Sequence, residues 1–123
     1  MAIAAFIIVA MAVLSGSALG IMHLQTEGRT TPPWLLAALH GIFGIGGFGC
    51  LVLALRGPAR GLDQTIGSFG MIATALIALA ALLGVSFIAT RLLKRRPAGI
   101  LIGIHATLAV TGFVILAAYV FAG

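Results

Sequence analysis

Charged residues are scarce in this sequence, which excludes a soluble globular domain. Asp, Glu, Lys and Arg together make up 7% of the 123 residues, whereas soluble domains carry about a quarter. Hydrophobic residues make up 62%, and the mean hydropathy is +1.26. Because the chain has too few polar groups to cover its surface in water, we expect an integral membrane protein whose surroundings are a lipid bilayer.

Acidic residues are nearly absent, and this argues against one class of transporter. The two acids are Glu27 and Asp63, and both lie between long apolar stretches. In length and number of apolar stretches the chain resembles small multidrug exporters, whose coupling depends on a glutamate embedded in the first span. The stretch 2–22 contains no glutamate. A small four-helix transporter stays as an alternative function, but it would have to use a histidine in place of that carboxylate.

Disulfides and a transmembrane β-barrel are also excluded. Cys50 is the only cysteine, so an intramolecular disulfide cannot form. The apolar stretches are continuous, whereas the strands of a membrane barrel alternate between polar and apolar residues. The spanning elements are therefore expected to be helices.

Four apolar stretches are long enough to cross a bilayer, for which a helix needs about 20 residues. They are 2–22, 34–55, 66–90 and 98–121. The first has no Lys or Arg before it and is long for the core of a signal peptide, so we expect it to be retained as a span. Together the stretches use nearly the whole chain. The sequence predicts an all-α integral membrane four-helix bundle, a single transmembrane domain over 1–123.

Basic residues are distributed unequally over the three predicted loops. With four spans, the first and third loops share one side, and the second loop shares the other side with both termini. The first side carries Arg29, Arg91, Lys94, Arg95 and Arg96, and the second carries Arg56 and Arg60. Because Lys and Arg accumulate in cytoplasmic loops, we expect loops one and three in the cytoplasm and both termini outside, as in a bacterial inner membrane. The basic charge then sets topology, and no nucleic-acid partner is expected.

Two of the three histidines lie inside apolar spans and recur in a similar context. His40 and His105 are each followed by Gly-Phe, at 47–48 and 112–113, so the two copies are 65 residues apart. Upstream, LGIMHLQT (19–26) is similar to LGVSFIAT (83–90) at an offset of 64. We interpret the chain as two tandem two-helix repeats. Because each repeat has an even number of spans, the repeats have parallel orientation in the membrane.

An ionisable residue inside a span is costly and points to a function. His40 and His105 follow Pro33 and Pro97 at nearly equal spacing, so both lie about 10–12 Å along their helices and are expected to face each other. Two neutral imidazoles at one depth suit a metal between them. In membrane proteins the metal centre commonly held by two histidines is b-type haem, and we expect both residues to be metal ligands. Two separate tetrapyrroles, or polar contacts without any ligand, are the alternatives.

Small residues near each histidine would leave room for a flat ring. Gly44 and Gly47 share a helix face with His40, as Ala109 and Gly112 do with His105. Small residues also allow close helix packing without a ligand, which is the simpler interpretation.

The polar residues near the same end suit the edge of such a cofactor. Arg29 and Arg91 are cationic partners for haem propionates. His23, at the end of the first span, is a further candidate for a propionate or a quinone oxygen, although an interfacial histidine is usually only solvated. Trp34 marks the membrane interface beside a plausible quinone position.

With a histidine in the second and fourth spans and glycine-rich packing below, the sequence resembles small four-helix b-type cytochromes. The broad relatives are the cytochrome b561-like proteins and the haem-bearing membrane anchors of respiratory dehydrogenases. The resemblance covers the chain in architecture and rests on His40 and His105. The b561 proteins proper have more helices and two histidine pairs, so here one bis-histidine haem b is implied.

What the resemblance implies is electron transfer. The chain would exchange electrons with quinone or with a partner redox subunit, and it would be at most a redox subunit of an oxidoreductase complex. The alternative is a ligand-free accessory or anchor subunit that packs against a larger membrane complex.

Overall fold

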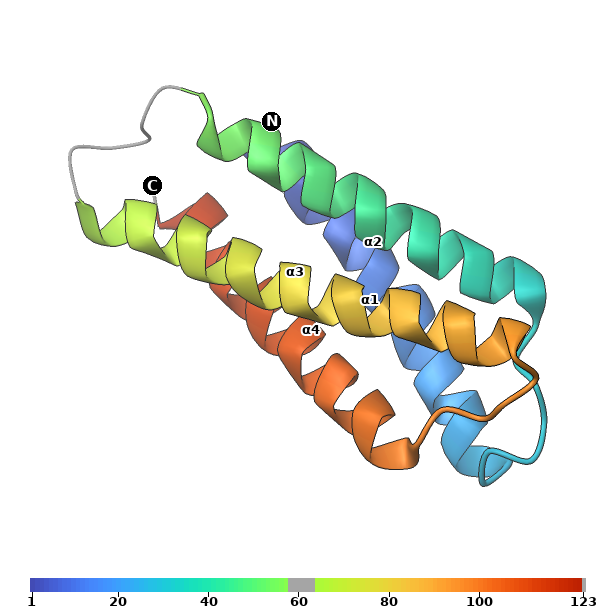
Figure 1. Ribbon diagram of the computed structural model, residues 1–123. Coiled ribbons are helices and arrows are strands. Elements are labelled where there is room, and N and C mark those ends of the chain that lie inside the picture. The colour runs from blue at the N-terminus through green and yellow to red at the C-terminus, as the bar shows by residue number, and fades with distance from the viewer. Residues whose placement is uncertain (58–63, 123) are drawn as a thin grey trace.

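Four α-helices make up the protein in a computed structural model that describes residues 1–57 and 64–122 (Figure 1). The helices are α1 (Ala2–Gln25), α2 (Trp34–Leu55), α3 (Gln64–Leu92) and α4 (Gly99–Phe121). Each is long and apolar enough to cross a membrane, and the described residues contain no strand. The predicted all-α fold with four spans is confirmed. Residues 58–63, with the predicted loop residues Arg60 and Asp63, lie outside the described residues.

The helices begin and end close to the predicted boundaries. α2 begins directly after Pro33, whose missing amide proton does no harm before the first helical turn. α1 runs slightly further than predicted and ends where Glu27 and Gly28 adopt left-handed backbone angles, with φ of 51° and 68°. The amide of Gly28 donates to the carbonyl of His23 at 2.9 Å and so closes the last turn. α3 is followed by a similar left-handed residue, Lys94, with φ of 53°.

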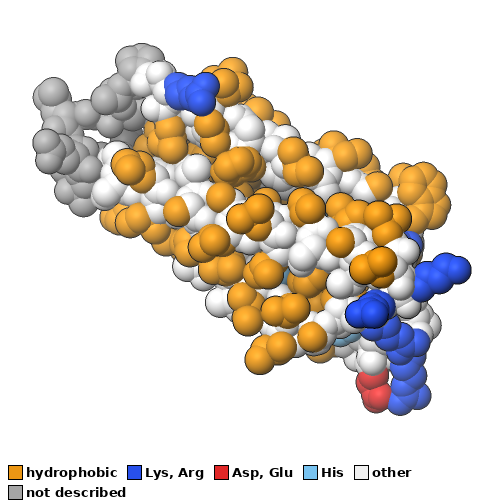
Figure 2. Space-filling model, viewed as in Figure 1, with side chains coloured by type: hydrophobic (Ala, Val, Ile, Leu, Met, Phe, Trp, Pro, Cys, Tyr) orange, Lys and Arg blue, Asp and Glu red, His pale blue; other side chains and the backbone are white. Residues whose placement is uncertain are grey.

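The connections 26–33 (loop 1) and 93–98 (loop 3) lie together at one end of the bundle. Arg91 Nη2 donates to the carbonyl of Pro32 at 3.4 Å, and Arg96 Nη2 donates to the carbonyl of Arg29 at 3.1 Å. Lys and Arg side chains gather at this end, while hydrophobic side chains cover the flanks of the helices (Figure 2). Apolar flanks between polar ends indicate a lipid bilayer around the bundle.

The helices pack as two pairs. α1 has its most extensive contacts with α2, and α3 has its most extensive contacts with α4. Thinner interfaces between α1 and α4 and between α2 and α3 join the pairs. Within the described residues the backbones of α1 and α3 do not approach each other closely, and neither do those of α2 and α4, so these helices lie across the diagonals of the bundle.

The two pairs repeat the same contacts, which supports the interpretation as tandem repeats. Val9 of α1 fills the space beside Gly47 of α2, and Ile77 of α3 does the same beside Gly112 of α4. Gly47 and Gly112 are 65 residues apart in the sequence, which is the predicted offset between α2 and α4. Val9 and Ile77 are 68 residues apart, so the offset between α1 and α3 is 68. The predicted offset of 64 for the first helices is therefore wrong by one turn. An apolar helix rich in Leu, Ala and Gly matches a copy of itself equally well one turn away, because residues four apart share a face.

The buried core occupies only the half of the bundle that contains the chain termini. The buried residues of α1 lie within 2–12, those of α2 within 47–51, those of α3 within 70–80 and those of α4 within 112–120. Between this core and loops 1 and 3 no described residue is buried. α3 and α4 diverge towards loop 3 in Figure 1. We call residues 13–25, 34–46, 81–92 and 99–111 the open half, because they form no closely packed core of their own.

Gly47→Ala is expected to lower the free energy of unfolding by about 1–3 kcal/mol, because overpacking a close helix contact forces the backbones apart. A β-carbon at Gly47 would lie 2.6 Å from Val9 Cγ2 and 3.1 Å from the Val9 backbone nitrogen. Denaturation of the detergent-solubilised protein, followed by circular dichroism, measures the change.

Gly49→Ala is the matched control. Gly49 is exposed, and a β-carbon there would have nothing within 4 Å. We expect this substitution to be neutral or to stabilise the helix by up to about 1 kcal/mol, the difference in helix propensity. Equal destabilisation by both substitutions would contradict the packing role of Gly47.

Candidate functional site

His40 of α2 and His105 of α4 meet across one diagonal of the bundle. Their ring centroids are 5.8 Å apart, and the ring planes make an angle of 77°. Both side chains are half-buried. The structure thus brings together the two imidazoles that the sequence analysis places at one depth. The third histidine, His23, does not join them, because its ring lies against Gly28 in loop 1.

Each imidazole is held by a hydrogen bond to the helix that precedes it in the chain. Nδ1 of His40 lies 2.8 Å from the carbonyl oxygen of Ala12 in α1, and Nδ1 of His105 lies 2.8 Å from that of Ala80 in α3. A carbonyl oxygen can only accept, so Nδ1 is the donor in both rings. In a neutral imidazole this leaves the Nε2 atom without a proton. In this tautomer each Nε2 atom carries a lone pair and can act only as an acceptor or a metal ligand.

Two glycines let the rings approach the backbones of α1 and α3. A β-carbon at Gly16 would lie 2.6 Å from His40 Cε1, and one at Gly84 would lie 3.4 Å from His105 Cε1. Each glycine follows the accepting alanine by one helical turn. The alanine carbonyl and the space left by the missing glycine side chain therefore lie on the same face of the helix. The sequence analysis missed these residues. The signal was present, because Ala-x-x-x-Gly occurs at 12–16 and again at 80–84.

The two imidazoles differ in their aromatic neighbours. The ring of Phe87 in α3 lies edge-on to His105, with centroids 5.5 Å apart and planes at 71°. Among the described residues His40 has no aromatic neighbour of this kind other than His105. The hydrogen bond to a backbone carbonyl is therefore common to both repeats, whereas the contact with Phe87 occurs at His105 and not at His40.

The four predicted small residues fall into two groups. Gly44 is half-buried, and a β-carbon there would meet nothing within 4 Å, so there is space one turn from His40. Ala109 is likewise half-buried one turn from His105. Gly47 and Gly112 differ, because the neighbouring helix already fills the space beside them. We correct the prediction accordingly: these two glycines allow the helices of each pair to pack, and we leave them out of the candidate site.

The predicted cationic residues lie at the end of the open half and not beside the rings. Arg29 is exposed and forms an ion pair with Glu27. Arg91 is exposed and hydrogen-bonds to loop 1. No hydrogen bond or ring contact joins either arginine to an imidazole in the described part of the chain.

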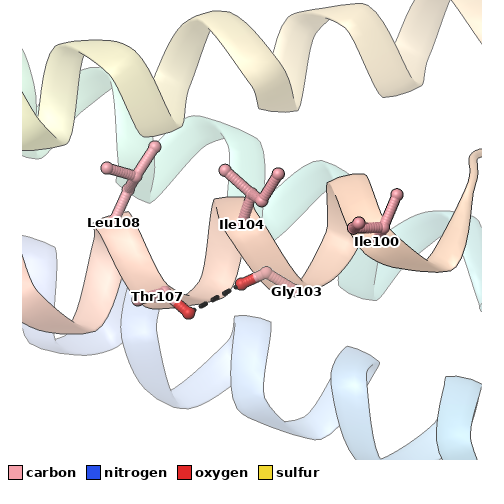
Figure 3. Close-up of a pocket in the computed structure, with 5 residues that line it drawn as sticks. All are labelled: Ile100, Gly103, Ile104, Thr107 and Leu108. Atoms are coloured by element: carbon pink, nitrogen blue, oxygen red, sulfur yellow. Dashed lines mark hydrogen bonds between the residues drawn. The ribbon is translucent and has the colours of Figure 1, made fainter.

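A shallow groove on α4 is separate from the histidine pair. It has a volume of about 380 Å³ and is lined by Ile100, Gly103, Ile104, Thr107 and Leu108 (Figure 3). The hydroxyl of Thr107 donates to the carbonyl of Gly103 at 2.9 Å, so the groove offers no unpaired polar side chain. We exclude it from the site.

The donor set limits what metal the histidines can hold. No group of three or more His, Cys, Asp or Glu side chains able to bind a metal occurs in the described part of the chain. Zinc in proteins takes three or four such ligands, so two imidazoles do not make a site for a free ion. Comparisons with protein families, curated proteins and solved structures found no match for this chain.

Gly16→Ala is expected to displace the His40 ring and to break its hydrogen bond to Ala12, since the new β-carbon would overlap Cε1 of that ring. Loss of this bond should cost about 1 kcal/mol of stability. It should also end the preference for a protonated Nδ1 in His40. Nitrogen-15 NMR of the protein with labelled histidine rings reports which ring nitrogen carries the proton.

Gly84→Ala serves as the comparison, because its β-carbon would sit at an ordinary contact distance of 3.4 Å from His105 Cε1. The His105 ring should keep a protonated Nδ1 in this variant. If the His40 tautomer were unchanged in Gly16→Ala, the hydrogen bond to Ala12 would not be what fixes it.

Proposed function

We propose that this chain is a membrane electron-transfer subunit that binds one b-type haem between His40 and His105. One observation carries the proposal. Two imidazoles from diagonal helices have their rings 5.8 Å apart, and each gives its Nδ1 proton to a backbone carbonyl. The described residues are four helices able to span a membrane and their short connections, so the proposed role is that of a redox subunit in an oxidoreductase complex.

The separation of the rings suits a shared metal. A metal–imidazole bond is about 2 Å long and each ring centre lies about 1 Å behind its nitrogen, so two imidazoles that held one metal would have centroids at most about 6 Å apart. The distance between the His40 and His105 centroids is 5.8 Å. The observed separation is therefore within the range that a shared metal would allow.

The hydrogen bonds to Ala12 and Ala80 favour the same role. Histidines that ligate metals usually donate their second ring proton to a carbonyl or carboxylate, which fixes the tautomer and increases the basicity of the ligating nitrogen. In this chain the acceptors are backbone carbonyls of α1 and α3. These acceptors do not depend on a side chain, so the orientation of both imidazoles is built into the helix pairs.

The open half supplies the surroundings that a haem needs. It contains both histidines and extends from the packed core to loops 1 and 3. It has no buried residue, and Gly44 leaves space beside His40. Its apolar side chains would exclude water from the faces of the macrocycle. Arg29 and Arg91 would hold the propionates at the polar end, where charge-assisted hydrogen bonds to carboxylates are strong. When bound, the haem iron supplies one-electron redox chemistry, and quinone or a partner redox subunit would donate and accept the electrons.

The lack of a core in the open half also favours the second candidate, a ligand-free accessory or anchor subunit. Helices of a larger complex could fill the same region. In this alternative the bonds to Ala12 and Ala80 only satisfy the N–H groups of two half-buried rings. The short distance between the two rings then has no role, and we therefore place this alternative second.

Purified protein supplied with haem is expected to show a reduced-minus-oxidised spectrum of a six-coordinate b-type cytochrome. His40→Ala and His105→Ala should each abolish the six-coordinate spectrum, because each removes one axial ligand. His23→Ala should leave it unchanged, since that ring lies at loop 1. Circular dichroism of each variant shows whether the helices are still formed. A folded wild-type protein that stays colourless with excess haem would refute the proposal and favour the accessory subunit.

Gly44→Leu tests the space beside the histidines without touching a ligand. A leucine there would fill the region that the macrocycle needs, so haem binding should weaken at least tenfold while the apo-protein stays helical. Gly49→Leu is the matched control, because Gly49 is exposed in the core half of α2. Haem titration monitored by absorbance measures both. Undiminished binding by Gly44→Leu would mean that the ring does not lie over this turn of α2.

A further inference from the structure

The strongest charged surface of the molecule lies at the end formed by loops 1 and 3. It contains five cations, Arg29, Arg91, Lys94, Arg95 and Arg96, and the described residues near it include one acid, Glu27. Glu27 is already paired with Arg29. Figure 2 shows Lys and Arg side chains gathered beside an acidic side chain at this end. We call the five residues the cationic end.

Two arginines join the two loops into one surface. Arg91 and Arg96 donate to carbonyls of loop 1, at 3.4 Å and 3.1 Å, although they lie far from it in the sequence. Lys94 and Arg95 are exposed, and within the described part of the chain their side chains make no hydrogen bond or ion pair. The contacts between the loops therefore use two of the guanidinium groups and leave two cations available for an outside ligand.

Apolar residues place this surface at the level of the lipid headgroups. Leu92 and Leu93 precede the available cations and are 78% and 69% exposed. Trp34, at the start of α2, is 71% exposed at the same end. Exposed aromatic side chains next to basic ones are typical of the boundary between the acyl chains and the headgroups.

We propose that the cationic end binds the phosphate headgroups of anionic phospholipids in the adjacent leaflet. Lys94 and Arg95 pair with the phosphates, while Leu92 and Trp34 contact the upper part of the acyl chains. A cluster of Lys and Arg directly beside a membrane span attracts anionic lipid strongly, and the attraction falls off within a Debye length. An acidic protein surface would satisfy the charges but not the exposed apolar residues beside them, so a lipid is the better fit. The inference does not depend on haem binding.

Trp34 gives a local readout, because it is the only tryptophan in the chain and lies at this end. The protein is reconstituted into vesicles of phosphatidylcholine and phosphatidylglycerol with matched acyl chains. In one series the phosphatidylglycerol carries brominated chains, and in the other series the phosphatidylcholine does. The ratio of the two quenching efficiencies of Trp34 reports which lipid is enriched beside it. Any bound pigment affects both series equally and cancels.

We expect phosphatidylglycerol to be enriched about tenfold at Trp34 at low salt, and less at higher salt. The double variant Lys94→Gln, Arg95→Gln should reduce the enrichment to about twofold or less. Arg56→Gln is the matched control, because Arg56 is an exposed cation at the other end of the bundle, and it should leave the ratio unchanged.

Equal quenching by the two lipids in the wild-type protein would overturn the proposal and leave an acidic protein surface as the counterpart of the cationic end. Equal loss of enrichment in the double variant and in Arg56→Gln would overturn it as well, since the effect would then reflect net charge. Circular dichroism confirms that each variant is folded before the comparison is made. A haem spectrum is not needed for any of these outcomes, so the result is independent of the proposed function.

Discussion

The hydrogen bonds from the two Nδ1 atoms to Ala12 and Ala80 are the constraint on which the rest of the site depends. An imidazole between membrane-spanning helices has no water to satisfy its N–H group, and leaving that group unpaired is costly. The chain meets this need with helix backbone and not with a side chain. The acceptor is therefore rigid, and the ring is held in one orientation and one tautomer. Everything proposed for Nε2, including a shared iron, follows from which nitrogen carries the proton.

The duplicated arrangement explains why there are two such rings at one height. Within each helix pair, an alanine carbonyl accepts the Nδ1 proton of the imidazole on the following helix, and a glycine one turn later leaves room for the ring. Two copies in parallel orientation then place the rings opposite each other across a diagonal. The copies are not identical, since Gly16 lies closer to its ring than Gly84 does, and Phe87 contacts only His105. If the proposed haem binds, the different surroundings of the two histidines would give the protein separate influence over each ligand, which is one of the means by which proteins adjust a haem potential.

The position of the core connects the site to the surface at loops 1 and 3. Ala12 and Ala80 are the last buried residues of α1 and α3 on the way to these loops, so the histidines lie where the packed core ends. On one side of them, interlocking residues such as Leu51 and Leu116 hold the four helices together. On the other side, Arg91 and Arg96 hydrogen-bond to loop 1 and so join the two helix pairs at their ends. A bundle that is closed at one end and loosely packed at the other can admit a flat ligand without unfolding, because the stabilising contacts lie elsewhere.

The sequence by itself determined the number of spans, their approximate ends and the common depth of His40 and His105. Those features depend on apolar length and on the rise of a helix, which are properties of one segment at a time. Only the tertiary structure decided that the rings face each other, that Ala12 and Ala80 accept their protons, and that Gly47 and Gly112 serve helix packing. It also decided that α1 corresponds to α3 at an offset of 68 and not 64. These features depend on how each helix is rotated about its own axis. The four helices are apolar on every side, so no periodic pattern in the sequence indicates which face turns inward.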